Sequence, residues 1–152
     1  MLFPLDLDYE EWKTLCRENW SEPSYRADQV CSWLYTRREF SFESMTNLSL
    51  QLREKAARTF GAALPERVRL EVSKRDGTQK SLWRLKDGET IESVLLNQEG
   101  RKTACISTQV GCPLNCAFCA TGQSGFVRNL ACGEITGQFL AMEKAIGGPI
   151  DN

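Results

Sequence analysis

Histidine is absent from this 152-residue sequence, and its absence removes several classes of catalytic and metal site. Serine–histidine and cysteine–histidine nucleophiles need an imidazole base, and many zinc sites use imidazole as a ligand. A bulk charge excess is also lacking, because 19 lysines and arginines stand against 20 aspartates and glutamates. The net charge of −1 therefore gives no footprint of a nucleic-acid-binding protein.

Long hydrophobic runs are also missing. No apolar stretch approaches the roughly 18 residues that a membrane-spanning helix needs. The chain runs from its first residues directly into Asp6 and Asp8, without the basic start and apolar core of a secretory signal. We therefore expect a cytoplasmic protein with no membrane partner. In that compartment, clustered cysteines indicate metal or redox chemistry rather than structural disulfides.

Enough apolar residues are present for a buried core. Hydrophobic residues make up 41% of the chain and charged residues 26%, which fits one domain or two small ones. Residues 1–60 carry eight basic and ten acidic side chains, whereas residues 61–110 carry nine and seven. The mildly basic middle of the chain fits either a solvated face or an RNA-binding surface.

Residues 1–62 predict a helical domain, because apolar residues recur there at helical spacing. Three helices are expected, at residues 9–20, 25–37 and 49–60. Asp6 or Asp8 can cap the first of them. Cys16 and Cys31 lie on the apolar faces of these helices, so we expect core residues rather than reactive thiols.

Residues 63–103 predict an antiparallel meander. Apolar and polar residues alternate from Val68 onward, and Asp76-Gly77 and Asp87-Gly88 are strong hairpin turns. Glu99-Gly100 is a weaker third turn. Four strands are expected, near residues 67–75, 79–86, 89–97 and 102–110.

Residues 104–152 predict a strand, a loop rich in glycine and cysteine over 111–127, and a helix over 132–146. A strand, a loop and a helix in this order open a βα unit. Ala131 and Cys132 are poor caps for that helix, and we assign no function to Cys132.

Three of the seven cysteines form a tight cluster. Cys112, Cys116 and Cys119 are separated by three and two residues, so one loop can bring three thiols to one metal centre. Soft thiolates suit three corners of a 4Fe-4S cluster, whose fourth iron can bind a small molecule through an amine and a carboxylate. Zinc would need Cys105 or Cys132 as a fourth ligand. A low-potential ferredoxin would need a fourth cysteine ligand at typical spacing. A third alternative is that the cysteines bind no metal, but three such thiols would serve no packing purpose.

The cysteine spacing, with Phe118 before the last cysteine, resembles the signature of radical S-adenosylmethionine enzymes. The flanking residues are closely similar to the bacterial dual-specificity adenine methyltransferases. Those enzymes methylate carbon 2 of an adenosine in large-subunit ribosomal RNA and in some transfer RNAs. The similar segments are YRADQV at 25–30, IESV at 91–94, CISTQVGC at 105–112, CATGQSGFVRNL at 119–130 and GEI at 133–135.

The resemblance implies an α+β fold in three parts. These are a three-helix accessory domain over residues 1–62, a four-stranded antiparallel meander over 63–103, and the first βα unit of a truncated radical-SAM (β/α) barrel over 104–152. It also implies two cofactors, a 4Fe-4S cluster and S-adenosylmethionine. The implied partners are ribosomal RNA, transfer RNA and an electron donor such as flavodoxin or ferredoxin, and the implied oligomeric state is a monomer.

The resemblance also assigns roles to individual residues. Cys112, Cys116 and Cys119 would ligate the cluster, and Phe118 would contact the cofactor. In the family, a methyl group is carried by a cysteine near the C-terminus, and its carbon radical adds to adenine. Cys105 matches the resolving cysteine, which releases the covalent adduct by forming a transient disulfide. Glu92 matches the proton acceptor, a role that suits a carboxylate in a cleft with a raised pKa.

Without the resemblance, Glu92 reads as a solvated strand residue and Cys105 as a strand packing residue. Ala104 and Ile106 take the inner face of that strand, so the Cys105 side chain is expected to point the other way.

The sequence also lacks parts that such an enzyme needs. A barrel of this type has about 200 or more residues. The glycine-rich strand end that holds the methionyl amine, the ribose contacts and the methyl-carrying cysteine are missing. We therefore expect the N-terminal portion of a radical RNA methyltransferase, an enzyme by resemblance but inactive as this chain alone. The alternatives are an iron–sulfur RNA-binding module without turnover and an iron–sulfur electron carrier.

Overall fold

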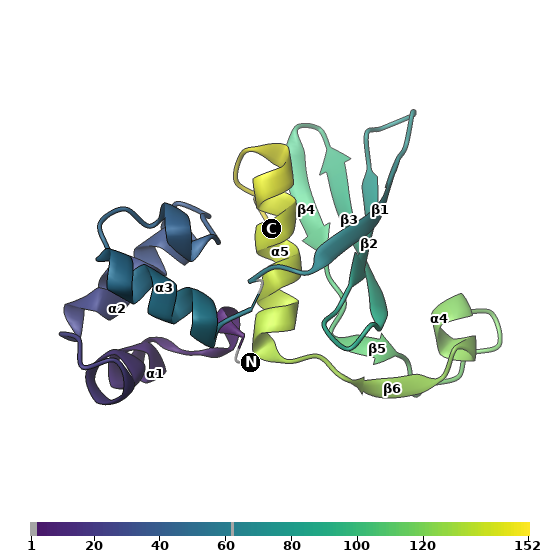
Figure 1. The fold of residues 1–152 in the computed structure, drawn as a ribbon. Helices are drawn as coiled ribbons and strands as arrows, with labels where there is room; N and C mark the ends of the chain where they lie inside the picture. Colours follow the sequence, from purple (N-terminus) through teal and green to yellow (C-terminus); the bar gives the residue numbers. More distant parts are fainter. Residues whose placement is uncertain (1–2, 62) are drawn as a thin grey trace. The chain divides into compact units, whose positions relative to one another are not determined.

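The computed structural model describes residues 3–61 and 63–152 (Figure 1). The chain divides into two compact units, Met1–Leu64 and Pro65–Asn152, and each is described by itself. The expected domain boundary at residue 62 falls on a position outside the described residues. In the described ranges, no helix is both long enough and apolar enough to cross a bilayer.

The first unit is helical, as the sequence predicts. Its helices are α1 (Tyr9–Thr14), α2 (Tyr25–Cys31) and α3 (Leu50–Thr59). A π-helical turn extends α1 to Asn19, and another extends α2 to Thr36. Asp8 caps α1, since its carboxylate accepts from the Glu11 amide at 2.8 Å while the Glu11 side chain accepts from the Asp8 amide at 2.8 Å.

Aromatic rings form the core of this unit. The ring of Trp12 lies 5.0 Å from that of Phe60 and 6.2 Å from that of Trp20, and Phe42 stacks on Phe60 at 5.5 Å. These contacts place the apolar faces of α1 and α3 together. The residues predicted for the helix faces are largely buried, which confirms the helical spacing: Trp12, Cys16, Val30, Leu34, Leu48, Leu52, Ala56 and Phe60.

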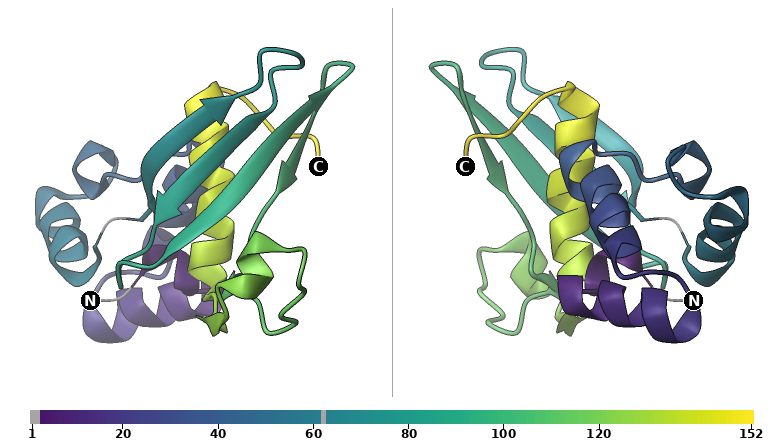
Figure 2. Two further views of the ribbon diagram at one scale, coloured as in Figure 1. Left: turned by 90° about the vertical axis from the view of Figure 1, so that its right-hand side faces the viewer. Right: turned by 90° about the vertical axis from the view of Figure 1, so that its left-hand side faces the viewer.

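The second unit contains a four-stranded antiparallel sheet in the order β1-β2-β3-β4. Its strands are β1 (Glu66–Val72), β2 (Gln79–Arg84), β3 (Thr90–Gln98) and β4 (Arg101–Cys105). The three predicted turns are confirmed, and Gly77, Gly88 and Gly100 all have positive φ angles. Helix α5 (Cys132–Ile146) covers one face of the sheet (Figure 2), and every residue of β1 stays exposed.

The prediction of one strand over 102–110 is wrong. Strand β4 ends at Cys105, and Gln109–Gly111 forms a separate strand, β5. The physical reason lies at Ser107, whose backbone amide and carbonyl bond to the side chain of Gln138 instead of to a neighbouring strand.

The prediction of an uninterrupted loop over 111–127 is also wrong. This segment contains the short helix α4 (Ala120–Gln123) and the start of β6 (Phe126–Asn129), which pairs with β5. The loop between β5 and β6 therefore begins and ends at two paired strands.

Helix α5 begins and ends where the sequence predicts, and Gly147 stops it with a φ of +66°. Beyond it, the Asn152 amide donates to the Lys102 carbonyl at 3.2 Å, and the Ala104 amide donates to the Asn152 carbonyl at 2.7 Å. Two such bonds that flank one residue are the pattern of parallel pairing. The residues after α5 thus lie beside β4 in parallel orientation.

Candidate functional site

Two backbone contacts close the base of the cysteine loop, residues 112–125. Gly111 pairs with Phe126, and the Cys112 amide donates to the Gly125 carbonyl oxygen at 2.9 Å. Gly111 has a φ of +72°, and a Cβ atom there would lie 1.9 Å from that same oxygen. Only glycine fits directly before the first cysteine.

Inside the loop, the chain packs closely around Cys116. The Cys119 amide donates to the Cys116 carbonyl at 3.0 Å. Gly122 lies against the backbone of the same residue, because a Cβ atom on it would come within 2.9 Å of the Cys116 nitrogen. The thiols of Cys112, Cys116 and Cys119 are partly exposed and free. Among the described residues, no three potential ligands are grouped to hold a metal ion, so a cluster would draw these thiols together as it binds.

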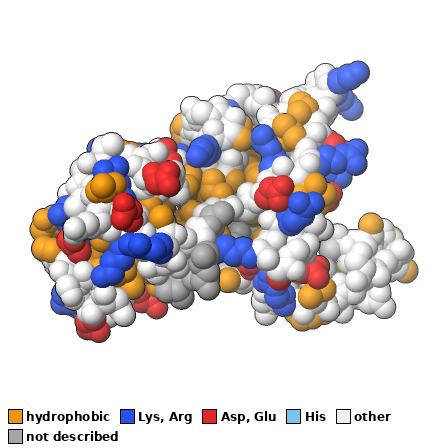
Figure 3. Space-filling model, viewed as in Figure 1, with side chains coloured by type: hydrophobic (Ala, Val, Ile, Leu, Met, Phe, Trp, Pro, Cys, Tyr) orange, Lys and Arg blue, Asp and Glu red, His pale blue; other side chains and the backbone are white. Residues whose placement is uncertain are grey.

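The chemistry of the loop fits an iron–sulfur cluster. No charged residue occurs from Thr103 to Val127, so no carboxylate of this segment competes with the soft thiol ligands. Phe118 is 92% exposed and Leu114 is 76% exposed. The surface around α4 accordingly lacks charged side chains and carries hydrophobic ones (Figure 3). These side chains offer an apolar surface beside the three cysteines.

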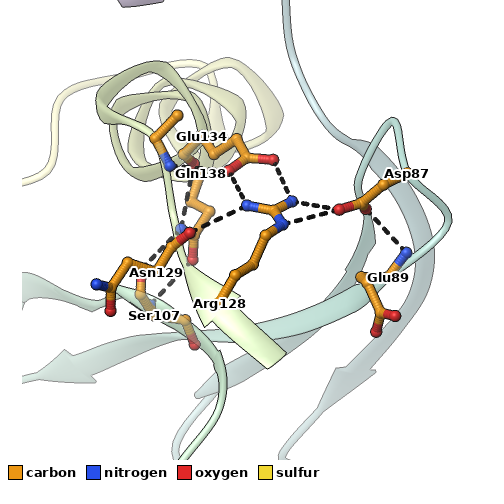
Figure 4. A network of polar contacts seen from close by, with 8 residues as sticks. Asp87, Glu89, Ser107, Arg128, Asn129, Glu134 and Gln138 are labelled. Carbon is orange, nitrogen blue, oxygen red and sulfur yellow. Dashed lines mark hydrogen bonds and ion pairs between the residues drawn. The ribbon is translucent and has the colours of Figure 1, made fainter. Parts of the chain in front are cut away.

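Arg128 lies on β6, the strand that follows the cysteine loop, and its hydrogen bonds hold this strand in place (Figure 4). Its guanidinium donates two hydrogen bonds to Glu134 on α5, at 2.7 and 2.8 Å. It donates two more to Asp87 in the turn between β2 and β3, at 2.6 and 2.8 Å. Hydrogen bonding to Arg128 lowers the pKa of the Glu134 carboxyl below its ordinary value. One side chain thus ties three elements together beside the loop.

Glu92 and Cys105 point to the same face of the sheet, the face opposite α5. Cys105 is directly opposite Val94 in the β3–β4 pair, and Val94 is two residues from Glu92 on β3. Cys105 is exposed, as predicted. The Glu92 carboxylate is 53% exposed and lies 3.1 Å from the Lys80 ammonium. It therefore sits on an open surface of this chain and not in a cleft.

The remaining cysteines differ in burial. Burial raises the pKa of both Cys16 and Cys31 to about 11. Cys132 is exposed at the start of α5. All seven cysteines belong to the described residues and all are free thiols, so the disulfide implied for Cys105 is not formed in this structure.

Sequence reasoning missed two residues near Glu92 and Cys105. Lys80 could have been found from the hairpin register, which places it diagonally across from Glu92. Gln138 could not, because its partner Ser107 is 31 residues away and no pattern links the two.

Comparison with known proteins gives a consistent result. Residues 5–60 match the family described as the ribosomal RNA large subunit methyltransferase N-terminal domain. The chain is 51% identical over 140 residues to the probable dual-specificity RNA methyltransferase RlmN of Petrotoga mobilis, covering 92% of this chain and 40% of that protein. The protein of the same name from Thermosipho melanesiensis is 55% identical over 139 residues, covering 91% of this chain and 41% of that protein.

A solved structure agrees with these relatives. The crystal structure of a radical SAM methyltransferase from Sphaerobacter thermophilus matches with a TM-score of 0.90 and 35% sequence identity, covering 100% of this chain and 45% of that chain.

The chain is similar to the N-terminal part of the dual-specificity RNA methyltransferases. It spans about two fifths of the length of the curated relatives it matches. The mixed fold with a four-stranded antiparallel sheet is confirmed. The finer division of the second unit into a meander over 63–103 and the start of a barrel over 104–152 stays a prediction.

Proposed function

We propose that the chain supplies the accessory and cluster-binding parts of a radical S-adenosylmethionine enzyme. The enzyme would methylate carbon 2 of adenosine in large-subunit ribosomal RNA and in transfer RNA. One observation carries the proposal. The three-cysteine loop stands between paired strands in a chain that is 51–55% identical to probable dual-specificity RNA methyltransferases.

The cysteine loop is the proposed site of the 4Fe-4S cluster. Cys112, Cys116 and Cys119 would ligate three irons through their thiolates. When bound and reduced, the cluster supplies the electron that cleaves S-adenosylmethionine. Phe118 offers an exposed aromatic surface on which the cofactor can pack. Gly111 and Gly125 hold the two ends of the loop together, so the first cysteine starts from a fixed position.

Glu92 and Cys105 are the proposed reactive groups on the open face of the sheet. The Glu92 carboxylate would accept the proton from carbon 2 of the adenine adduct. The Cys105 thiolate would attack the sulfur of the methyl-carrying cysteine. An S–S bond would form as the bond from that sulfur to the transferred carbon breaks, and that carbon would keep the electron pair and take up a proton to become the methyl group of the released base. Cys105 is exposed, which this attack requires. The methyl-carrying cysteine is expected in a part of the family that residues 1–152 do not match.

Further expectations accompany this proposal. The partners are ribosomal RNA, transfer RNA and an electron donor such as flavodoxin or ferredoxin, and the enzyme acts as a cytoplasmic monomer. The mildly basic stretch over 61–110 and the cations of the β1–β2 hairpin are compatible with an RNA partner.

Anaerobic reconstitution of the purified chain with iron and sulfide tests the proposal. We expect about four irons per chain and the visible absorbance of a 4Fe-4S cluster. Replacing Cys112, Cys116 and Cys119 together by alanine should abolish both. The matched control is Cys132→Ala, which removes an exposed thiol outside the loop and should leave the iron content unchanged. Stoichiometric tetrahedral zinc without iron uptake would contradict the proposal.

A further inference from the structure

Gln138 is a fully buried polar side chain in the core of the second unit. It lies on α5, and its exposed fraction is 0%. Its Oε1 atom accepts from the Ser93 hydroxyl at 2.7 Å and from the Ser107 amide at 3.0 Å. Its Nε2 atom donates to the Ser107 carbonyl at 2.9 Å and to the Glu134 carbonyl at 3.2 Å. All four hydrogen-bonding positions of the amide are therefore used.

The two bonds to Ser107 resemble those of a strand partner. A neighbouring strand in a ladder bonds both the amide and the carbonyl of one residue, and the Gln138 side chain does the same. Ser107 lies between the end of β4 and the start of β5, where the sheet ladder is interrupted. One side chain from α5 thus replaces the missing strand at this break.

From Ser107 the contacts lead to Glu92 and Cys105. The Ser107 hydroxyl donates to the Glu92 carbonyl at 2.7 Å. Ser93, the next residue after Glu92, donates its hydroxyl to Gln138. Cys105 is two residues before Ser107 in the same chain segment. The backbone next to both proposed reactive residues is therefore held by one amide group.

We propose that Gln138 is a positioning residue that holds the backbone of Glu92 and Cys105 in one fixed register through Ser107. The roles of Glu92 and Cys105 rest on the proposed function, but the positioning itself does not. A methionine of similar length would fill the same space, yet it would leave the Ser107 amide, the Ser107 carbonyl and the Ser93 hydroxyl without this partner. Packing alone therefore does not account for a glutamine at this position.

Amide hydrogen exchange and thiol alkylation on the 152-residue chain test the proposal without cluster or RNA. In Gln138→Met, we expect the Ser107 amide to exchange at least ~10-fold faster, in proportion to the loss of one part-buried hydrogen bond. The alkylation rate of Cys105 should change by at least ~3-fold, while exchange of the Leu95 amide in the β3 ladder stays as in the wild type. The matched control is Gln98→Met, an exposed glutamine at the end of β3, which should change neither rate.

Two outcomes would overturn the proposal. One is a Ser107 amide and a Cys105 thiol that behave in Gln138→Met as in the wild type. The other is a uniform acceleration across the whole sheet, which would mean that Gln138 contributes only to general stability. If Gln138→Met does not fold, hydrogen exchange in the wild-type chain still tests the proposal. Its Ser107 amide must be as protected as the amides of the β2–β3 ladder, and fast exchange there would contradict the proposal. Loss of methyl transfer with these rates intact would count against the proposed function alone.

Discussion

Arg128 and Glu134 face each other with two parallel hydrogen bonds, of 2.7 and 2.8 Å, between a guanidinium and a carboxylate. The pair joins the strand that follows the cysteine loop to the first turn of α5. The Glu134 carboxylate also accepts from the Ala131 amide at 2.9 Å. It thereby caps the start of α5, where the alanine side chain at the N-cap position cannot do so. Asp87 completes the cluster from the β2–β3 turn. The position of β6, the strand that follows the cysteine loop, therefore depends on charged groups from three separate elements.

Arg128→Met should destabilise the second unit by about 1–2 kcal/mol near neutral pH, because a bidentate, partly buried ion pair is lost. The Glu134 pKa is lowered from 4.5 by its bonds to Arg128. A lowered carboxyl pKa gives stability that is full above the unfolded-state value and is lost as the pH falls through the folded-state value. The difference between variant and wild type should therefore shrink in acid, as measured by urea unfolding across the acidic range.

Arg84→Met is the matched control for this experiment. Arg84 pairs with Glu66 at 3.1 Å, but both side chains are largely exposed. Its replacement should change the free energy of unfolding by less than about 0.5 kcal/mol. Equal losses of unfolding free energy in the two variants would contradict the stabilising role assigned to the hydrogen bonds of Arg128 with Glu134 and Asp87.

Gly111→Ala should disrupt the base of the cysteine loop. The new Cβ atom would lie 1.9 Å from the Gly125 carbonyl oxygen, so the β5–β6 pairing must shift. Gly125→Ala is a control in the same loop, since it has a positive φ of +77° but no atom within 4 Å of the new Cβ. It should cost only the backbone strain of about 1–2 kcal/mol. Iron uptake after reconstitution should fall strongly in the first variant and little in the second, and a reversed order would show that the contact is unimportant.

Cys16 and Cys31 should resist thiol reagents in the folded chain. Their pKa values of about 11 leave only about one thiol in a thousand ionised near pH 8, and Cys16 is fully buried. Exposed Cys105 should be alkylated at least ~10 times faster, as followed by mass spectrometry of labelled peptides. Denaturant should abolish the difference. Rapid native labelling of Cys16 would mean that the assigned face of α1 is wrong.

The 152-residue chain alone should transfer no methyl group to RNA, because it does not supply the methyl-carrying cysteine or a closed barrel that shields a radical from water. Fusion to the C-terminal part of a close relative should restore turnover. In that fusion, Cys105→Ala should trap a covalent protein–RNA adduct, and Glu92→Gln should slow its release. The measurement is transfer of a radiolabelled methyl group, followed by gel analysis of the adduct. Multiple turnovers by residues 1–152 would show that the catalytic groups are misassigned.

Local patterns account for what the sequence predicted well. The helix faces around Trp12 and Leu52 follow from spacing along one element, and the turns at Gly77 and Gly88 follow from adjacent residues. The cysteine motif is also local, because its three thiols lie within eight residues.

Contacts between distant residues account for what was missed. The break after Cys105 depends on Gln138, whose side chain outcompetes strand pairing at Ser107. Strand β6 was missed because Phe126 and Val127 both remain exposed, so the segment lacks the alternation of a half-buried strand. The partners of Arg128 lie 6 and 41 residues away, and no spacing rule connects them.

The exposed strand β1 has a consequence for how copies of this chain behave together. It stands at the end of the strand order, and all seven of its residues are exposed, with Leu70 at 41% and Val72 at 55%. An edge of this kind can pair with the same edge of another copy. A bulge between Arg67 and Arg69 twists the edge, and the charged side chains that alternate along it repel an in-register copy. Replacing Arg67 and Arg69 by neutral residues would therefore allow β1 to pair with β1 of another copy, and the chain would self-associate.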